Sequence, residues 1–301
     1  MFSAIQKWGS FVRFSHTIFA LPFALAAMAV AARENRGWPG WRICGLILVA
    51  MVCARTCAMA FNRIVDRKFD ALNPRTAKRH LPAGQIGLAS AIFLCALAAA
   101  GLVVASYFLN PICFYLSPVA LVVICFYSLT KRFTDYTHVF LGISLALAPI
   151  GAWLAVKGAA VSPMEIVQML TLAVSVVLWL IGFDIIYALQ DYEFDRSHGL
   201  RSLVVAWGPK NALQASFLAH VLMCGSLLAF GLLSFGLRPI AYIIGWLVIV
   251  ICLVLEHWIA RRRSLNWINI AFFRLNAVVS AVFLVVTLAE VVFQGGGFRA
   301  R

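Results

Sequence analysis

Residues 41–70 read WRICGLILVAMVCARTCAMAFNRIVDRKFD, and this stretch decides what kind of protein the chain is. Its first part is almost wholly apolar and long enough to cross a bilayer as a helix, which takes about 20 such residues. At its end, Asn62, Asp66 and Asp70 follow one another at intervals of four. Because residues four apart lie on one face of an α-helix, these side chains form a polar stripe. The stretch therefore predicts a membrane-spanning helix that ends in a row of amide and carboxylate groups.

The whole chain shares this apolar character. Of its 301 residues 63% are hydrophobic and 12% are charged, with a mean hydropathy of +0.93, whereas soluble domains are about 45–50% apolar and about 25% charged. These values exclude a water-soluble enzyme and a disordered chain. The net charge of +14 is also found in multi-pass membrane proteins, whose cytoplasmic loops face anionic lipid. We therefore expect an integral membrane protein in contact with the lipid bilayer, and no nucleic-acid partner.

Nine apolar stretches are long enough to span a membrane. Backbone groups in lipid must bond within their own segment, so these stretches predict an all-α, multi-pass bundle of nine transmembrane helices. No hydrophilic extension is long enough for a second domain, and we expect residues 1–301 to form a single transmembrane domain. The predicted spans are roughly 11–32, 41–65, 86–108, 111–130, 137–157, 163–190, 211–235, 239–260 and 268–293.

The basic residues predict the orientation of the bundle. With the N-terminus in the cytoplasm, the inside segments hold fifteen Lys and Arg residues and the outside segments hold seven. The positive-inside rule then favours a cytoplasmic N-terminus. The two long basic loops, 66–85 and 191–210, would both lie on the cytoplasmic side of a cell inner (plasma) membrane.

A second acidic stripe follows the sixth predicted span. Asp184, Asp191 and Asp195 are spaced by seven and four residues, which again places them on one helix face. Ionisable groups at membrane depth are expensive and usually face the interior of a bundle or a watery cavity. The alternative, charges that merely mark the membrane interface, places acids at helix C-termini, where the helix dipole favours cations. We therefore expect the two stripes to face each other across one cavity.

Two facing clusters of oxygen ligands suit a hard divalent cation. Mg²⁺ typically takes one or two carboxylates together with substrate phosphates. Basic residues, which complement phosphate oxygens, follow both stripes and also occur in the third cytoplasmic loop. These features predict a metal–diphosphate site. The basic residues are Arg67, Lys68, Arg75, Lys78, Arg79, Lys131, Arg132, Arg196 and Arg201.

Four motifs follow one another along the chain: N-x-x-x-D-x-x-x-D at 62–70, R-T-x-x-R-x-L-P-x-G at 75–84, Y-x-x-x-K at 127–131 and D-x-x-x-D at 191–195. In this order they resemble the UbiA superfamily of intramembrane aromatic prenyltransferases, and within it the 4-hydroxybenzoate polyprenyltransferases. Arg55 matches the arginine that precedes the first motif. The sequence departs from the hydroxybenzoate enzymes at Ser15-His16 and at Asn62-Arg63, and both strings also occur in the branch thought to prenylate a dihydroxynaphthoate for menaquinone.

The resemblance implies a Mg²⁺-dependent ionisation of a polyprenyl diphosphate, followed by alkylation of an aromatic acid. It assigns the metal to Asn62, Asp66, Asp70, Asp191 and Asp195, and catalysis to these aspartates and Arg55. Arg67, Arg75, Arg79, Lys131 and Arg201 would bind the diphosphate, with Tyr127 and Tyr187 orienting phosphate or stabilising the cation through a π face.

The acceptor site is the least determined part of the prediction. Arg55 would hold the acceptor carboxylate, or else pair with an aspartate of the other stripe. Asp184 would act on the acceptor or pair with Arg55, and His16 would bond the acceptor or simply pack. Asp135 and His138 fall outside the motifs, and we expect them in a solvated loop.

The preferred function is the transfer of a polyprenyl group onto a carbon of 4-hydroxybenzoate in quinone biosynthesis, for ubiquinone or menaquinone. One alternative is the same chemistry on a dihydroxynaphthoate, and another is a secondary transporter, since carriers also place acids in helices. The sequence does not determine the length of the prenyl chain or the oligomeric state.

Overall fold

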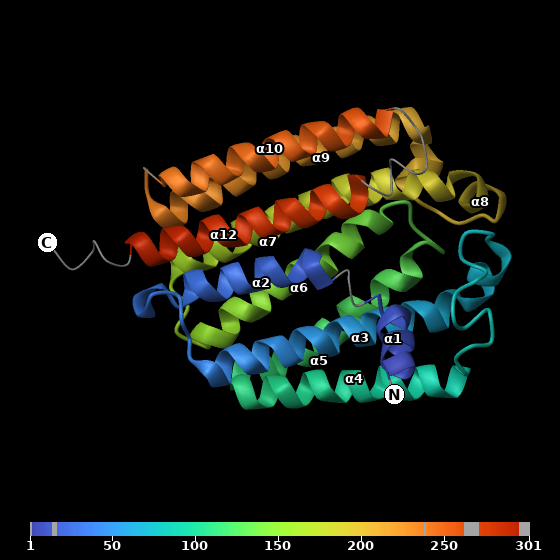
Figure 1. The fold of residues 1–301 in the computed structure, drawn as a ribbon, viewed down its shortest axis with the longest axis horizontal. Helices are drawn as coiled ribbons and strands as arrows, with labels where there is room; N and C mark the ends of the chain where they lie inside the picture. Colours follow the sequence, from blue (N-terminus) through green and yellow to red (C-terminus); the bar gives the residue numbers. More distant parts are fainter. Residues whose placement is uncertain (1, 14–16, 238, 262–270, 295–301) are drawn as a thin grey trace, which may run out of the picture.

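The chain folds into a bundle of helices, seen here in a computed structural model that describes residues 2–13, 17–237, 239–261 and 271–294 (Figure 1). Eight helical segments in these ranges are long and apolar enough to cross a membrane, and α2 is a shorter apolar helix. The predicted all-α multi-pass fold is confirmed. The apolar helices of the bundle are α2 (Thr17–Ala31), α3 (Trp41–Leu72), α4 (Leu88–Leu109), α5 (Pro111–Thr130), α6 (Thr137–Lys157), α7 (Pro163–Ala188), α9 (Leu203–Phe235), α10 (Ile240–Arg261) and α12 (Asn276–Gln294), which follows the π-helical turn Ala271–Leu275.

The predicted spans differ from the observed helices mainly at their ends. The first span, predicted from residue 11, is wrong at its start, because α1 (Phe2–Phe11) ends there and α2 begins at Thr17. The second continues to Leu72, so the whole first acidic stripe is helical. The seventh, predicted from residue 211, begins at Leu203 as α9. A kink at Gly208 (φ 75°), followed by Pro209, joins its short first piece to the rest of the helix. Hydropathy misses the last turns of α3 because they are polar, whereas at α9 the Gly208-Pro209 pair hides an apolar first turn.

Short polar signals begin several of these helices. Asn110 accepts a hydrogen bond from the Cys113 amide (3.0 Å) ahead of α5. Ser162 and Glu165 exchange bonds with each other's backbone amides in a capping box at the start of α7. Both helices have proline as their first residue, where a missing N–H leaves no bond unmade. Asn110-Pro111 and Ser162-Pro163, which lie where one predicted span gives way to the next, therefore act as helix starts.

Helix α2 lies at the centre of the bundle. It packs against α6 on one side and α12 on the other (Figure 1). Phe23 is fully buried and stacks on Phe283 of α12, with ring centroids 4.7 Å apart, and also meets Trp179 of α7. This burial explains how a helix of 15 residues, about 22 Å long, holds its place without spanning the full bilayer core of about 30 Å.

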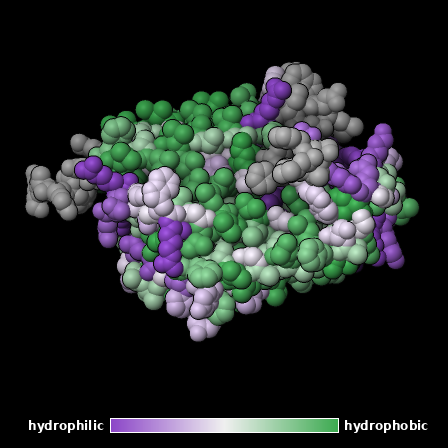
Figure 2. All heavy atoms as spheres, turned by 60° about the horizontal axis from the view of Figure 1, so that its bottom comes forward, coloured by the Kyte–Doolittle hydropathy of each residue, from purple (hydrophilic) through white to green (hydrophobic). Residues whose placement is uncertain are grey.

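The outer surface is apolar between two polar ends. Figure 2 shows hydrophobic residues over the middle of one face, with most hydrophilic residues gathered towards its two ends. Large apolar side chains such as Phe93 on α4 and Val122 on α5 are mostly exposed, at 69% and 66%. An exposed apolar belt of this kind is what a lipid-facing surface requires.

Helices α6 and α7 approach each other closely at Gly142. A Cβ atom at this position would lie 3.0 Å from the carbonyl oxygen of Val177 and 3.1 Å from its Cα. Small residues allow such contacts between helices in membranes. The close approach brings the first turn of α6, which carries His138, beside the last turns of α7, which carry Asp184.

We expect Gly142→Leu to lower the free energy of unfolding by about 1–3 kcal/mol, the usual effect of overpacking, because the backbone of Val177 cannot move aside like a flexible side chain. The thermal midpoint of the protein in detergent measures the effect. Gly225→Leu on α9 is the matched control, since a Cβ there has no neighbour within 4 Å. Equal midpoints for the two variants would contradict this account.

Candidate active site

Both acidic stripes line a single cavity of about 270 Å³. The first stripe comes from the end of α3. The second comes from the end of α7, the 3₁₀ turn Leu189–Asp191 and α8 (Tyr192–Ser197), all at one end of the bundle (Figure 1). The predicted convergence of the two stripes is therefore present. The cavity is lined by the predicted site residues Arg55, Asn62, Asp66, Asp70, Arg75, Arg79, Tyr127, Lys131, Asp184, Tyr187, Asp191 and Asp195.

Contacts between distant loops hold the second stripe in place. Arg75 donates two hydrogen bonds to the Asp191 carboxylate, at 2.8 Å from Nε and 2.5 Å from Nη2, and Asn73 donates a third at 3.1 Å. Arg75 also donates to the Tyr187 hydroxyl at 3.0 Å. Lys131, after α5, pairs with Asp195 at 3.3 Å. The basic segment after α3 is thus bonded to the acids that follow α7.

The first stripe is paired in the same way. Arg132 lies 2.9 Å from Asp66 Oδ1, while Asn62 donates to Asp66 Oδ2 at 2.9 Å. Arg79 bonds Asp70 Oδ1 at 2.6 Å, and the buried Arg63 lies 3.8 Å from Asp70 Oδ2. Each of the four motif aspartates therefore faces at least one permanently charged side chain, as low-dielectric burial of a charge requires.

Among the cations in the loops outside the spans, Arg75 and Lys131 have pKa values that their neighbours raise. Burial alone would lower the pKa of Arg75, but the hydrogen bonds and charges of Asp191 and Tyr187 together outweigh this and the net shift is upward. Burial acts in the same direction on Lys131, whose pKa is nevertheless raised by the charges of Asp195, Asp191 and Asp184. Both side chains are therefore fully charged at neutral pH and available to an anion.

Cations outnumber acids around the cavity, so it suits an anionic ligand. Seven cationic and five acidic side chains line it. Oppositely charged pairs cancel, which leaves a positive excess before any metal is added. The cations are Arg13, Arg55, Arg63, Arg75, Arg79, Lys131 and Arg132, and the acids are Asp66, Asp70, Asp184, Asp191 and Asp195.

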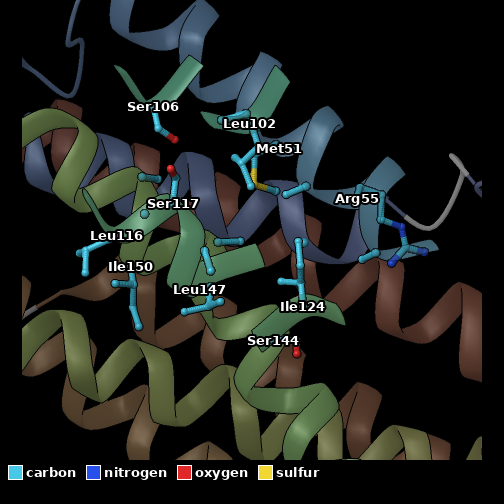
Figure 3. A pocket seen from close by; sticks show the side chains of 18 of the residues that line it. Met51, Arg55, Leu102, Ser106, Leu116, Ser117, Ile124, Ser144, Leu147 and Ile150 are labelled. Atoms are coloured by element: carbon cyan, nitrogen blue, oxygen red, sulfur yellow. The ribbon is translucent and has the colours of Figure 1, made fainter. Parts of the chain in front are cut away.

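A second cavity, also of about 270 Å³, adjoins the first and is almost wholly apolar. Arg55, Tyr127, Leu141 and Leu145 line both cavities and mark where they meet. Figure 3 shows Arg55 at one edge of the second cavity and apolar side chains such as Met51 along the rest. The charged cavity and the apolar cavity thus share a boundary at Arg55 and Tyr127.

Arg55 forms no ion pair with an aspartate in the part of the chain that the structure describes. Its buried Nε atom has no hydrogen-bond partner. The alternative in which Arg55 pairs with the second stripe is wrong, because Asp184 bonds His138 instead. A buried guanidinium nitrogen without a partner points to a ligand that supplies one.

Two predicted substrate-binding residues, Arg67 and Arg201, are not among the described residues that line the cavity. Arg67 donates to the carbonyl of Ile64 in its own helix at 2.9 Å. The Arg201 side chain is exposed and donates to the Phe133 carbonyl at 3.1 Å, while its backbone amide bonds Lys131. His16 lies outside the described residues. Arg67 lies on α3 and Arg201 in the loop before α9, and both donate to carbonyl groups rather than line the cavity.

The prediction that His138 lies in a solvated loop is wrong, and its place in the site was not foreseen. It lies in the first turn of α6, has no exposed surface, and its Nδ1 atom lies 2.6 Å from Asp184 Oδ2. Leu141 and Leu145 share its helix face and line the same cavity. The helical spacing of these residues was visible in the sequence, but the direction in which that face points was not.

The fold and the site define an integral membrane protein in which a charged cavity, lined by more cations than acids, adjoins an apolar one. Residues 20–278 match the UbiA prenyltransferase family. The chain belongs to this family and is a prenyltransferase, which sets aside the transporter alternative.

Individual relatives agree with this assignment. The 4-hydroxybenzoate octaprenyltransferases of Tolumonas auensis and Aliivibrio fischeri are 26% and 28% identical to the chain, over 85% and 86% of its length and 86% and 87% of theirs. A UbiA homologue from Aeropyrum pernix K1, solved in the apo form, has 32% identity and a TM-score of 0.81, covering 91% of this chain and 98% of that one. A UbiA homologue from Archaeoglobus fulgidus, bound to GPP and Mg²⁺, has the same fold at 21% identity, with a TM-score of 0.68 and 95% and 99% coverage.

Proposed function

We propose that the protein transfers a polyprenyl group from its diphosphate to a ring carbon of 4-hydroxybenzoate, as a step in quinone biosynthesis. The observation that carries this proposal is the junction of the charged and apolar cavities at Arg55 and Tyr127. A prenyl diphosphate has one highly charged end and one long apolar end. The relatives named as 4-hydroxybenzoate octaprenyltransferases support the choice of acceptor.

The charged cavity would receive the diphosphate. Arg75 and Arg79 from the loop after α3 and Lys131 from the loop after α5 line it, and each can donate charge-assisted hydrogen bonds to phosphate oxygens. Preorganised positive charge of this kind stabilises a leaving group as negative charge develops on it. The chain needs no covalent nucleophile for this step.

The oxygen atoms around the charged cavity fit Mg²⁺. Asn62, Asp66, Asp191 and Asp195 present amide and carboxylate oxygens, and the buried Asp70 Oδ2 atom has no hydrogen-bond partner. Among the described residues, no three His, Cys, Asp or Glu side chains are grouped closely enough to hold a metal by themselves. This agrees with a cation that takes few carboxylates and completes its shell with phosphate oxygens and water. When bound, Mg²⁺ would neutralise the diphosphate and act as a Lewis acid towards its oxygens.

The apolar cavity would receive the prenyl chain. Leu116 and Val119 on α5 line it and are also 46% and 57% exposed on the outer surface of the bundle. The cavity therefore extends from the diphosphate site towards the acyl chains of the bilayer. A chain longer than the cavity could continue into lipid without leaving an apolar environment. The apolar walls would also keep water from the allylic cation.

The acceptor would bind at the boundary of the two cavities. Arg55 is the cation nearest the apolar cavity and has an unpartnered Nε atom, so it is placed to hold a carboxylate. Arginine can grip a carboxylate through two parallel hydrogen bonds. The loops that form the charged cavity carry the basic residues expected inside, which supports an inner-membrane location with the site open to the cytoplasm.

The purified protein, incubated with Mg²⁺, a polyprenyl diphosphate and 4-hydroxybenzoate, is expected to release pyrophosphate and form a prenylated acid. Removal of Mg²⁺ with EDTA should abolish both signals, and excess Mg²⁺ should restore them. A parallel reaction with a dihydroxynaphthoate separates the alternative acceptor. Turnover with the naphthoate alone would overturn the choice of 4-hydroxybenzoate, and turnover with neither would overturn the proposal.

A further inference from the structure

Asp184 differs from the other four acids of the charged cavity in the kind of partner it has. Asp66, Asp70, Asp191 and Asp195 each face an arginine or lysine. Asp184 faces an imidazole, with 2.6 Å between its Oδ2 atom and His138 Nδ1. A proton taken up by one of the first four acids would break an ion pair with a permanent cation. A proton taken up by Asp184 would break none.

The surroundings of the pair fix its hydrogen-bonding state. His138 has no exposed surface, and its Nε2 atom is buried without a hydrogen-bond partner among the residues that the structure describes. If Nε2 carried a proton, that donor would be buried and unsatisfied, which is costly. The neutral tautomer with its proton on Nδ1 avoids this cost and donates that proton to Asp184.

Asp184 is the member of the pair that reaches the cavity. Its side chain is 21% exposed, whereas His138 is fully enclosed. Asp184 lines the charged cavity, and so do Arg55, Leu141 and Leu145, which mark the boundary with the apolar cavity. An aromatic acid held by Arg55 at this boundary would share the cavity with a carboxylate that forms no ion pair with an arginine or lysine among the described residues.

We propose that Asp184 accepts the hydroxyl proton of the aromatic acceptor and that His138 is a positioning residue that holds the Asp184 carboxylate. This inference rests on the proposed function. As the proton leaves, the acceptor becomes a phenolate, whose ortho carbon is a stronger nucleophile. The bond between C1 of the prenyl group and the diphosphate oxygen breaks, with both electrons going to oxygen, and the new C–C bond forms from the ring electrons.

The remaining protons balance without another reactant. The ring proton at the new bond passes to the released diphosphate, which restores the aromatic ring. Asp184 returns its proton to the phenolic oxygen of the product. The imidazole of His138 keeps its Nδ1 proton throughout and fixes the carboxylate so that its other oxygen faces the acceptor. The pair therefore ends the cycle in the state in which it began.

Asp184→Asn tests the proton acceptor. We expect kcat to fall about 10²- to 10⁴-fold, the usual contribution of a general base, while the KM values for both substrates change little. With 3-fluoro-4-hydroxybenzoate, whose hydroxyl is more acidic and which keeps one free ortho carbon, the ratio of wild-type to variant kcat should shrink by about tenfold. An unchanged ratio, or a kcat equal to that of the wild type, would overturn the assignment.

Two substitutions at His138 test the positioning role. His138→Asn keeps an N–H group close to the place of Nδ1, whereas His138→Leu removes it at similar size. We expect the asparagine variant to retain most of kcat and the leucine variant to lose at least about tenfold, with equal KM for the prenyl diphosphate. Equal kcat in the two variants would overturn the role of His138. In all these assays, absence of turnover by the wild-type protein would count against the proposed function itself.

Discussion

Replacing Asp191 by asparagine is expected to lower kcat by about 10³-fold, at the upper end of what a single preorganised electrostatic group contributes. The Asp191 carboxylate accepts two hydrogen bonds from Arg75 and one from Asn73. An amide of the same shape cannot pair with the guanidinium or offer two anionic oxygens to a cation. The change therefore weakens the proposed metal site and frees Arg75 from its partner. Asp66→Asn, in the first stripe, should have an effect of similar size.

The matched control for Asp191→Asn is Glu193→Gln. Glu193 lies between Asp191 and Asp195 in the sequence but is exposed and does not line the cavity. It should keep near wild-type activity. Pyrophosphate release measures turnover, and the elution volume and thermal midpoint in detergent show whether each variant is folded. Normal, Mg²⁺-dependent activity in a folded Asp191→Asn protein would rule out the paired-acid site.

Arg55→Met is expected to raise the KM for 4-hydroxybenzoate by about 10- to 150-fold, the equivalent of the 1.5–3 kcal/mol that a hydrogen bond to a charged group contributes. Methionine keeps most of the apolar stem but removes the cation at the boundary of the two cavities. The KM for the prenyl diphosphate should stay near its wild-type value, because Arg75, Arg79 and Lys131 remain. Steady-state kinetics with each substrate varied in turn measure both constants.

An acceptor without a carboxylate provides the control for Arg55→Met. Phenol offers the same ring and hydroxyl but gives Arg55 nothing to bind. The wild-type protein and the variant should therefore use phenol with equal kcat/KM. If Arg55→Met impaired phenol as severely as 4-hydroxybenzoate, Arg55 would act on the diphosphate or on the fold and not on the acceptor carboxylate.

Much of the site could be predicted because its parts are local. Asn62, Asp66 and Asp70 share a face in any helix that contains them, and the apolar run before them fixes the depth of that helix in the membrane. The second stripe was predicted on one helix face, and this is wrong, because Asp184, Asp191 and Asp195 lie in α7, the 3₁₀ turn and α8 in turn. The three acids nevertheless line the same cavity. The nine apolar stretches predicted the nine apolar helices of the bundle, and the errors lie at the ends of these helices.

The pairings across the site could not be predicted from local spacing. Arg75 and Arg201 both lie in basic loops, yet Arg75 bonds Asp191 while Arg201 bonds the carbonyl of Phe133. Long side chains in loops can reach several partners, and the packing of the helices below decides which of them is near. Arg67 was predicted on its charge alone, and a carbonyl of its own helix takes up its guanidinium.

The sequence by itself determined a membrane bundle with two acidic stripes, because hydropathy and helical periodicity depend only on neighbours along the chain. The tertiary structure decided that His138 meets Asp184 and that an apolar cavity opens beside Arg55. In lipid, the outer and inner faces of a helix are nearly equally apolar, so composition does not reveal which face turns inward. Close contacts between helices, such as that of Gly142 with Val177, make this choice, and they exist only once the bundle has formed.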